Sequence, residues 1–205
     1  MLDLRILVAD STTEHVVKAV LQRHHSLGIS SPFHDKSTVI VHSERDPGVY
    51  RRGHELLSAS PKARYTLVIL DSDWDGAPSA DTIRSYIMQN LSTVGISEDV
   101  SDVIVIEPEL EKWIWVIDNP NFLRIINWDG TSSDLRNWLL DNHFELDAHN
   151  KPSRPKEALE AVLYYTGRPF SSAIHKEIAE VVSLHNCVEP TFLMFKNRLN
   201  EWFGL

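Results

Sequence analysis

Acidic side chains follow three apolar segments of this 205-residue chain, and carboxylates are side chains that bind divalent cations. Segments 5–9, 65–70 and 100–106 each read as a buried strand that ends in carboxylates. If the strands are parallel, their carboxyl ends share the edge of the sheet where such folds bind ligands. Crowded carboxylates stay ionised only beside a cation. The sequence therefore predicts a Mg²⁺ (or Mn²⁺) site with the candidate ligands Asp10, Asp71, Asp73, Asp75 and Glu109.

The same acids also have a purely structural interpretation. Asp10 and Asp71 could cap the helices that follow their strands. The segment 73–76 could be a solvated turn. Both interpretations stay open for single residues, because only the convergence of all three strand ends calls for a metal ion.

Basic side chains crowd residues 42–54, just after the second predicted strand. Guanidinium and imidazole groups beside carboxylates and a metal ion suit a phosphate group. Arg45 is therefore a candidate phosphate clamp, and His42 or His54 a candidate acid or base. Alternatively, Arg45 and Asp46 form a loop network tied to the backbone, while His54 packs on a helix.

Strands and helices alternate over the first half of the chain. The predicted strands are 5–9, 37–42, 65–70 and 100–106. The predicted helices between them are 14–27, 50–58 and 79–91. We expect a capping box at the first helix, with Ser11 as N-cap and Glu14 reaching back. The alternation predicts an α/β fold with a mainly parallel, Rossmann-like, four-stranded sheet flanked by helices.

Helical patterns replace strand patterns from about residue 109 onward. The predicted helices are 109–117, 133–140, 155–165, 171–183 and 190–203. We therefore divide the chain into an α/β domain over 1–118 and a helical C-terminal extension over 119–205 packed on it. Trp113 and Trp115 cannot share one helical face, so we expect one in the core and the other on a contact surface.

Composition and charge narrow the class of protein. The net charge is −9, and residues 1–150 hold 23 Asp and Glu against 13 Lys and Arg, which weighs against a broad basic surface for nucleic acid. The single cysteine, Cys187, favours a reducing compartment. The sequence has no signal-peptide pattern, no apolar run of membrane-spanning length, and no Walker or Gly-x-Gly-x-x-Gly motif. We expect a cytoplasmic protein that does not bind membranes.

The placement of the acids resembles the Toprim fold of topoisomerases, primases and the overcoming-lysogenization-defect nucleases. Toprim proteins hold Mg²⁺ for phosphodiester chemistry with an acid after the first strand and an Asp-x-Asp pair two strands later. Asp10 matches the first acid and Asp71 and Asp73 match the pair, with Asp75 as an additional ligand. Toprim's first acid is normally a glutamate followed by glycine, whereas Asp10 is followed by Ser11. This departure questions the use of Asp10 as a general acid or base.

A second resemblance covers nearly the whole chain. It is to a family of small prokaryotic proteins associated with antiphage defence gene clusters, including methylation-associated defence systems. The motifs that carry it are Val8-Ala9-Asp10, His42-Ser43-Glu44-Arg45-Asp46-Pro47-Gly48 with Gly53-His54-Glu55, Glu107-Pro108-Glu109-Leu110-Glu111-x-Trp113-x-Trp115 and Lys151-Pro152-x-Arg154-Pro155-Lys156-Glu157-Ala158. The resemblance implies a component that acts with other defence-system proteins, and with nucleic acid through their complex.

These patterns leave three hypotheses for the function. The first is a Mg²⁺-dependent, nuclease-like component that cleaves phosphodiester bonds, in which Asp10, Asp71 and Asp73 hold the ion and Arg45 orients the phosphate. The second is a catalytically silent adaptor of a multi-protein defence complex, favoured by the low basic charge, the altered first acid and tryptophans that look exposed. The third is a receiver-like phosphoacceptor at Asp71, although paired acids after the first strand are absent and no lysine after a fifth strand can be located.

Overall fold

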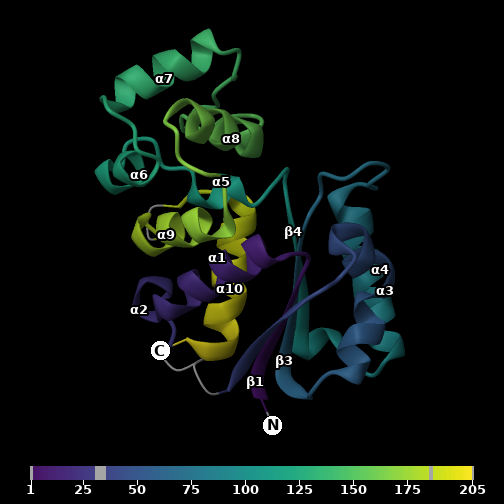
Figure 1. Cartoon of the computed structure of the whole chain (residues 1–205). Coiled ribbons are helices and arrows are strands. Elements are labelled where there is room, and N and C mark those ends of the chain that lie inside the picture. Colours follow the sequence, from purple (N-terminus) through teal and green to yellow (C-terminus); the bar gives the residue numbers. More distant parts are fainter. Residues whose placement is uncertain (1, 31–35, 185–186, 205) are drawn as a thin grey trace.

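A parallel β-sheet forms the centre of the protein. The computed structural model describes residues 2–30, 36–184 and 187–204, and within them four strands pair in the order β2-β1-β3-β4 (Figure 1). The strands are β1 (Leu2–Val8), β2 (Ser37–Val41), β3 (Ala63–Asp71) and β4 (Ser101–Ile106), and each neighbouring pair is parallel. The predicted α/β fold, with its parallel sheet, flanking helices and helical C-terminal part, is confirmed.

Both faces of the sheet are buried, because successive side chains of a strand point to opposite faces. On one face, Ile6 of β1 packs in a core with α1 (Ser11–Gln22) and helices of the C-terminal part. On the other face, Leu7 packs with α3 (Arg45–Ala59) and α4 (Ala80–Thr93). The continuously apolar strands of the sequence reflect this double burial.

The C-terminal part closes one face of the sheet and extends past the ends of the strands. Its helices are α5 (Glu111–Ile114), α6 (Pro120–Ile125), α7 (Ser132–Asp141), α8 (Pro155–Tyr165), α9 (Ser172–Val181) and α10 (Pro190–Phe203). Helix α9 packs against α1, and α10 packs against β4 and the short α2 (His24–Leu27). Figure 1 shows α7 and α8 beyond α5, on the side away from the sheet. Helices from 1–118 and 119–205 therefore contribute to one core.

The order of the strands places a topological switch point, where open α/β sheets have their ligand crevice, at the carboxyl edge of the sheet. The chain passes from β1 to α1 on one face, and from β3 to α4 on the other. Neighbouring strands whose following helices lie on opposite faces leave an opening between their carboxyl ends, where ligands of open α/β sheets bind. Here that opening lies between β1 and β3.

The first helix starts differently from the prediction. Asp10 is the N-cap of α1, because its carboxylate accepts a hydrogen bond from the backbone N of Thr13. The predicted capping box with Ser11 as N-cap is wrong, and Glu14 pairs instead with Lys18 one turn along the helix. The aspartate displaces the serine because it is already extended at the end of β1, with an oxygen in reach of the first turn.

Helix α3 begins at Arg45, before the predicted start at residue 50. Asp46, Pro47 and Gly48 form its first turn instead of a separate turn. Proline fits there because the amide groups of a first turn have no helical partner. The earlier start brings the side chain of Asp46 to the end of β3, as described below.

Trp113 and Trp115 are both buried, with 2% and 1% of their surface exposed. The ring of Trp113 packs against Phe192 and Phe195 of α10, and that of Trp115 against Phe122 of α6. The expectation that one of them lies on a contact surface is wrong, because helices from later in the chain cover the segment on more than one side. None of the helices in the described ranges is both long and apolar enough to cross a lipid bilayer.

Candidate functional site

Asp71, the last residue of β3, is a partly buried carboxylate beside other carboxylates. Its Oδ1 atom is shielded from solvent and has no hydrogen-bond partner among the described residues. Burial raises the pKa of Asp71 well above its usual range, and the charges of Asp46, Glu111 and Asp10 raise it further. Asp71 caps no helix, since the N-cap of α4 is Ser79. A carboxylate with one shielded oxygen that has no hydrogen-bond partner is stabilised by a proton or a cation.

Asp46 brings a second carboxylate to the same place from the first turn of α3. Its Oδ1 accepts a hydrogen bond from the backbone N of Asp71 at 2.9 Å. Burial raises the pKa of Asp46, and the charge of Asp10 adds to the rise, against the opposing effect of the backbone amides that donate to the carboxylate. The start of α3 and the end of β3 thus hold two carboxylates close together.

Asp10 adds a carboxylate from the end of β1. Its Oδ1 accepts hydrogen bonds from N and Oγ1 of Thr13, at 2.8 and 3.0 Å, and so caps α1. Its charge also raises the pKa values of Asp46 and Asp71. Asp10 therefore caps α1, which one of its two interpretations predicted, and its charge also acts on Asp46 and Asp71.

Two glutamates from the segment after β4 complete the group. Burial raises the pKa of Glu109 to about 7, and the charge of Glu111 contributes to the rise. Glu111, the first residue of α5, is also buried. Both glutamates raise the pKa of Asp71. We call these residues the acidic cluster: Asp10, Asp46, Asp71, Glu109 and Glu111.

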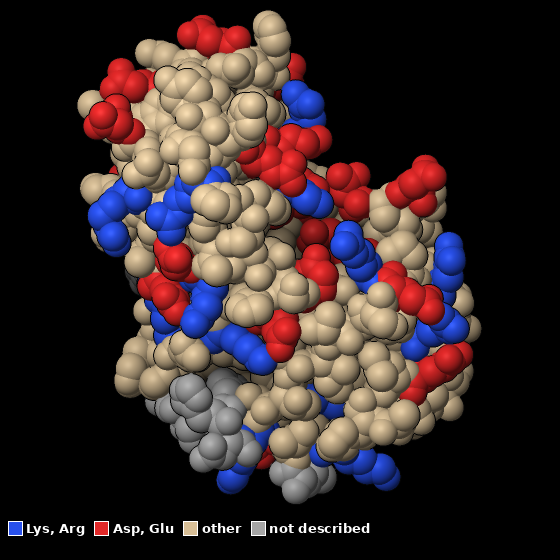
Figure 2. Space-filling model, viewed as in Figure 1, with Lys and Arg blue, Asp and Glu red and all other residues tan. Residues whose placement is uncertain are grey.

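Asp73 and Asp75, in the loop after β3, are exposed. Asp73 lies near enough to Glu109 for its charge to raise the pKa of that glutamate. Asp75 makes no contact with the acidic cluster in the described part of the chain. Figure 2 shows acidic side chains along both walls of the hollow that separates the α5–α8 part from the α3–α4 part. The structure thus brings Asp10, Asp71 and Glu109 together, places Asp73 at the margin and leaves Asp75 outside.

Lys156, in the first turn of α8, places a positive charge at the cluster. Its Nζ lies 3.8 Å from Oε1 of Glu109, and its backbone N donates to Oε2 of the same residue at 3.4 Å. Burial alone lowers the pKa of Lys156, but Glu109, Glu111 and Asp71 outweigh burial and raise that pKa. The lysine therefore neutralises part of the negative charge of the cluster.

Behind the cluster, Glu111 forms a buried pair with His175 of α9. The Nε2 of His175 lies 2.8 Å from Oε1 of Glu111, and its Nδ1 lies 2.9 Å from the carbonyl oxygen of Ser171. Since that carbonyl can only accept, Nδ1 carries the hydrogen of this contact. The pair holds the side chain of Glu111 in place from the α9 side.

Arg45 stands exposed at the rim, directly before Asp46 in the chain. Its guanidinium group has no hydrogen bond or ion pair within the described ranges. Its backbone has a φ of +53°, in the left-handed region that residues other than glycine rarely adopt. Strained residues of this kind gather at functional sites. Arg45 is thus an unpaired cation whose strained backbone is held beside the acidic cluster.

The two candidate histidines differ in their surroundings. His42 is buried, and its Nδ1 accepts a hydrogen bond from the backbone N of Glu44 at 3.1 Å. Burial lowers the pKa of His42, and the nearby charge of Arg52 lowers it further. His54 lies two turns beyond Asp46 on α3, about 12 Å along the helix axis. The structure therefore gives His42 a role in a turn and separates His54 from the cluster.

The capacity of the cluster for a metal ion is limited. In the parts of the chain that the structure describes, no three His, Cys, Asp or Glu side chains are arranged to hold a metal ion. Mg²⁺ requires fewer protein ligands, because one or two carboxylates suffice when water and phosphate oxygens complete the shell. The unpartnered oxygen of Asp71, next to Asp46, fits this smaller requirement.

Sequence reasoning missed four residues of the site. One interpretation of the sequence places Asp46 in a loop network, but Asp46 closely follows the second strand as Asp10 and Asp71 follow theirs, and this position is a usable signal. Glu111, Lys156 and His175 reach the cluster through contacts between distant segments, which no local pattern in the sequence indicates.

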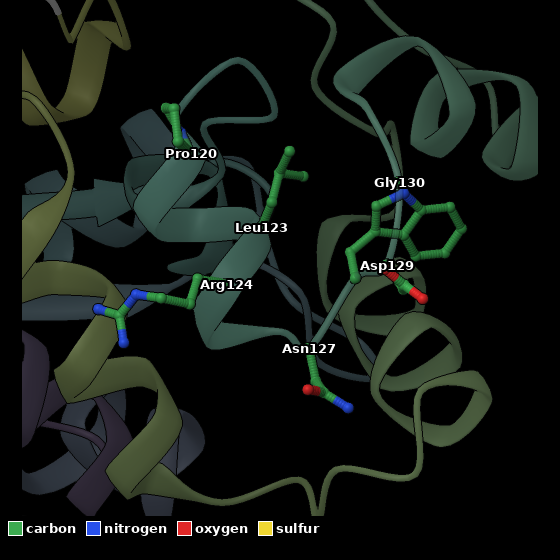
Figure 3. Close-up of a pocket in the computed structure, with 7 residues that line it drawn as sticks. Pro120, Leu123, Arg124, Asn127, Asp129 and Gly130 are labelled. Atoms are coloured by element: carbon green, nitrogen blue, oxygen red, sulfur yellow. The ribbon is translucent and has the colours of Figure 1, made fainter.

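Two hollows lie elsewhere, on the helical part. One of about 560 Å³ is lined by residues of α6 and of the segment after it, among them Pro120, Leu123, Arg124 and Asn127 (Figure 3). Another of about 430 Å³ shares Asn127 with it. No residue of the acidic cluster lines either hollow. The shapes of these hollows therefore add nothing to the chemistry at the strand ends.

Comparison with known proteins identifies no relative of the chain. No protein-family model, curated protein or solved structure matches the chain.

Proposed function

We propose that this protein is a Mg²⁺- or Mn²⁺-dependent phosphodiester-cleaving component of a prokaryotic antiphage defence system, with its site at the acidic cluster. The observation that carries the proposal is the buried, unpartnered Oδ1 of Asp71 at the crevice between β1 and β3. The link to antiphage defence depends on the four motifs of the sequence alone.

The charges at the crevice support a cation there. Four other carboxylates raise the pKa of Asp71, and Lys156 is the lysine that opposes them. A divalent cation removes this repulsion and leaves the acids ionised. Protonation also removes it, but the protonated acids are poor metal ligands. The arrangement therefore favours a site that is completed by a metal ion.

Each residue has a distinct part in the proposed chemistry. Asp71 and Asp46 would hold the ion, with Asp10 beside them. The ion would neutralise charge that develops on the phosphate and make a bound water a better nucleophile. Arg45, unpaired at the rim, would orient the phosphate through paired N–H groups. A histidine acid or base has less support, since His42 is engaged in a turn.

The test is hydrolysis of bis(p-nitrophenyl) phosphate by the isolated chain with Mg²⁺ or Mn²⁺. We expect metal-dependent turnover that Asp71→Asn reduces at least about 100-fold and Asp46→Asn reduces less. Asp81→Asn, a change at an exposed aspartate of α4, is the matched control and should leave turnover intact. Turnover that survives in Asp71→Asn contradicts the proposal.

The alternative, a catalytically silent adaptor, is favoured by two observations. Lys156 already supplies a cation to the cluster. Large apolar side chains are exposed on α7 and α8, with Leu140 at 54%, Tyr164 at 90% and Tyr165 at 62%. An adaptor predicts no metal-dependent turnover, together with capture of partners encoded beside its gene that Tyr164→Ala weakens. Turnover abolished by Asp71→Asn rejects it.

The receiver-like hypothesis has less support. A lysine does lie near Asp71, but Lys156 belongs to helix α8, and the described ranges contain no fifth strand that could carry it. Phosphorylation of Asp71 would also require a donor to reach a buried oxygen.

A further inference from the structure

Lys156 faces carboxylates from two elements of the sheet edge. It contacts Glu109, in the segment after β4, with both its ammonium group and its backbone N. Asp71, at the end of β3, lies close enough for its charge to raise the pKa of the lysine. One ammonium group therefore lies beside Glu109 and within reach of the charge of Asp71, among carboxylates that would also attract a metal ion.

The ion pair of Lys156 is loose compared with another lysine pair of the same protein. Its Nζ is 3.8 Å from Oε1 of Glu109, and half of its side chain is exposed. Lys151, by contrast, lies 2.8 Å from Oε1 of Glu189, with 8% of its side chain exposed. A direct charged hydrogen bond spans about 2.7–2.9 Å, so the Lys151 pair is a fixed structural contact and the Lys156 pair is not.

The geometry also lets the ammonium group move while the helix stays in place. The backbone N of Lys156 is held by Oε2 of Glu109, so the start of α8 remains attached to the sheet edge. The side chain itself is a flexible four-carbon stem with a compact charge at its end. It can leave the carboxylates without any change of the fold.

We propose that Lys156 neutralises the acidic cluster when no metal ion is bound, and that metal binding frees its ammonium group to bind the phosphate of the substrate. This inference rests on the proposed function. The ion, at Asp71 and Asp46, and the ammonium group, at Glu109, oppose each other, because both are attracted by the negative charge of one acidic cluster and repel one another. Once the ion neutralises the carboxylates, the phosphate is the remaining anion in reach of the lysine.

The first test measures the affinity of the full chain for Mn²⁺ alone by titration calorimetry. If Lys156 competes with the ion, Lys156→Met should bind Mn²⁺ about tenfold more tightly than the unmodified chain. Lys156→Arg keeps the charge and should bind it with nearly unchanged affinity. Lys176→Met removes a charge that pairs with Glu180 within α9, and controls for the change in net charge.

The second test measures binding of bis(p-nitrophenyl) phosphate at saturating Mg²⁺ by ligand-observed NMR. Lys156→Met should weaken this binding about tenfold, the opposite sign to its effect on Mn²⁺. If Lys156 only ties α8 to Glu109, Lys156→Met should lower the midpoint temperature of thermal unfolding and change neither the affinity for Mn²⁺ nor the affinity for the phosphodiester. Unchanged or weaker Mn²⁺ binding, or unchanged phosphodiester binding, overturns the inference.

Failure of the inference is distinguishable from failure of the proposed function. If Mn²⁺ binds the unmodified chain and is lost in Asp71→Asn, yet is not tightened in Lys156→Met, only the role of Lys156 is wrong. If the unmodified chain takes up no Mn²⁺, and Lys156→Met takes up none either, both fail.

Discussion

The backbone amide of Asp71 donates a hydrogen bond to the carboxylate of Asp46 at 2.9 Å, and so joins the end of β3 to the first turn of α3. The contact places two carboxylates side by side where the sheet opens between β1 and β3. Burial and mutual repulsion raise the pKa values of both acids. The fold therefore crowds carboxylates, whose ionised forms repel one another, at the place where open α/β sheets bind their ligands.

The stability of the metal-free protein should fall as the pH rises through the acidic range. The pKa of Glu109 is about 7 in the folded chain, against an ordinary value of 4.5. Between these values the folded chain retains a proton that the unfolded chain has lost, so the free energy of unfolding decreases with rising pH. The loss attributable to Glu109 is on the order of 3 kcal/mol, and Asp71 acts in the same direction.

Urea unfolding at pH 5, 6 and 7 measures this effect. Glu109→Gln should flatten the decrease, because the amide does not titrate. Glu145→Gln, at an exposed position on the helical part, should leave the profile as it is. If the free energy of unfolding falls equally steeply with pH in the unmodified chain and in Glu109→Gln, burial does not raise the pKa of Glu109 as described.

Replacing Arg45 with glycine should stabilise the protein while weakening phosphate binding. The φ of +53° costs a non-glycine residue about 1 kcal/mol, which glycine does not incur. Arg51→Gly, in the interior of the same helix, should instead destabilise by about 1 kcal/mol. Thermal unfolding of both variants checks the signs. Equal destabilisation by the two changes would show that Arg45 is not strained.

Gly48→Ala should destabilise the protein by about 1–3 kcal/mol. An added Cβ would lie 2.4 Å from Nδ1 of His42 and 2.5 Å from Cβ of Glu44, so the turn before α3 must shift. Denaturant unfolding measures the cost. His42→Ala removes one of the two clashes, so the double variant should lose less than the sum of the single changes. Additive losses would contradict this packing.

Much of the fold follows from the sequence because each strand is locally complete. Apolar runs that end in Asp10, Asp71 and Glu107 indicate buried parallel strands with acids at one edge, and the structure has that arrangement. The last helix, from Pro190 to Phe203, also begins and ends where its proline and glycine neighbours predict.

The rest of the site depends on contacts between distant segments. Pro47 and Gly48 mimic a turn, which conceals that Asp46 lies in the first turn of a helix. Lys156 and His175 reach the cluster only because α8 and α9 fold back over the end of β4 and over α1. Chain topology, rather than local pattern, determines these contacts.

His175→Ala should destabilise the protein by about 3 kcal/mol or more, because it leaves the buried Glu111 without its partner. The exposed His149→Ala is the matched control and should change the free energy of unfolding by less than about 0.5 kcal/mol. Guanidinium unfolding of the two variants gives the comparison. Equal stability of the His175 variant and the control would contradict the pairing of His175 with Glu111.

If Asp71 attracts a divalent cation to the carboxyl edge of the sheet, as we propose, calorimetric titration with Mn²⁺ will detect its binding. Asp71→Asn keeps the size of the side chain and removes its charge, while Asp81→Asn makes the same change at an exposed position outside the cluster. We predict saturable Mn²⁺ binding by the unmodified chain and by the Asp81 variant. The Asp71 variant should bind at least about tenfold more weakly, because it lacks one unit charge at the ion. Equal affinities in all three chains, or no binding heat in any of them, would contradict the account.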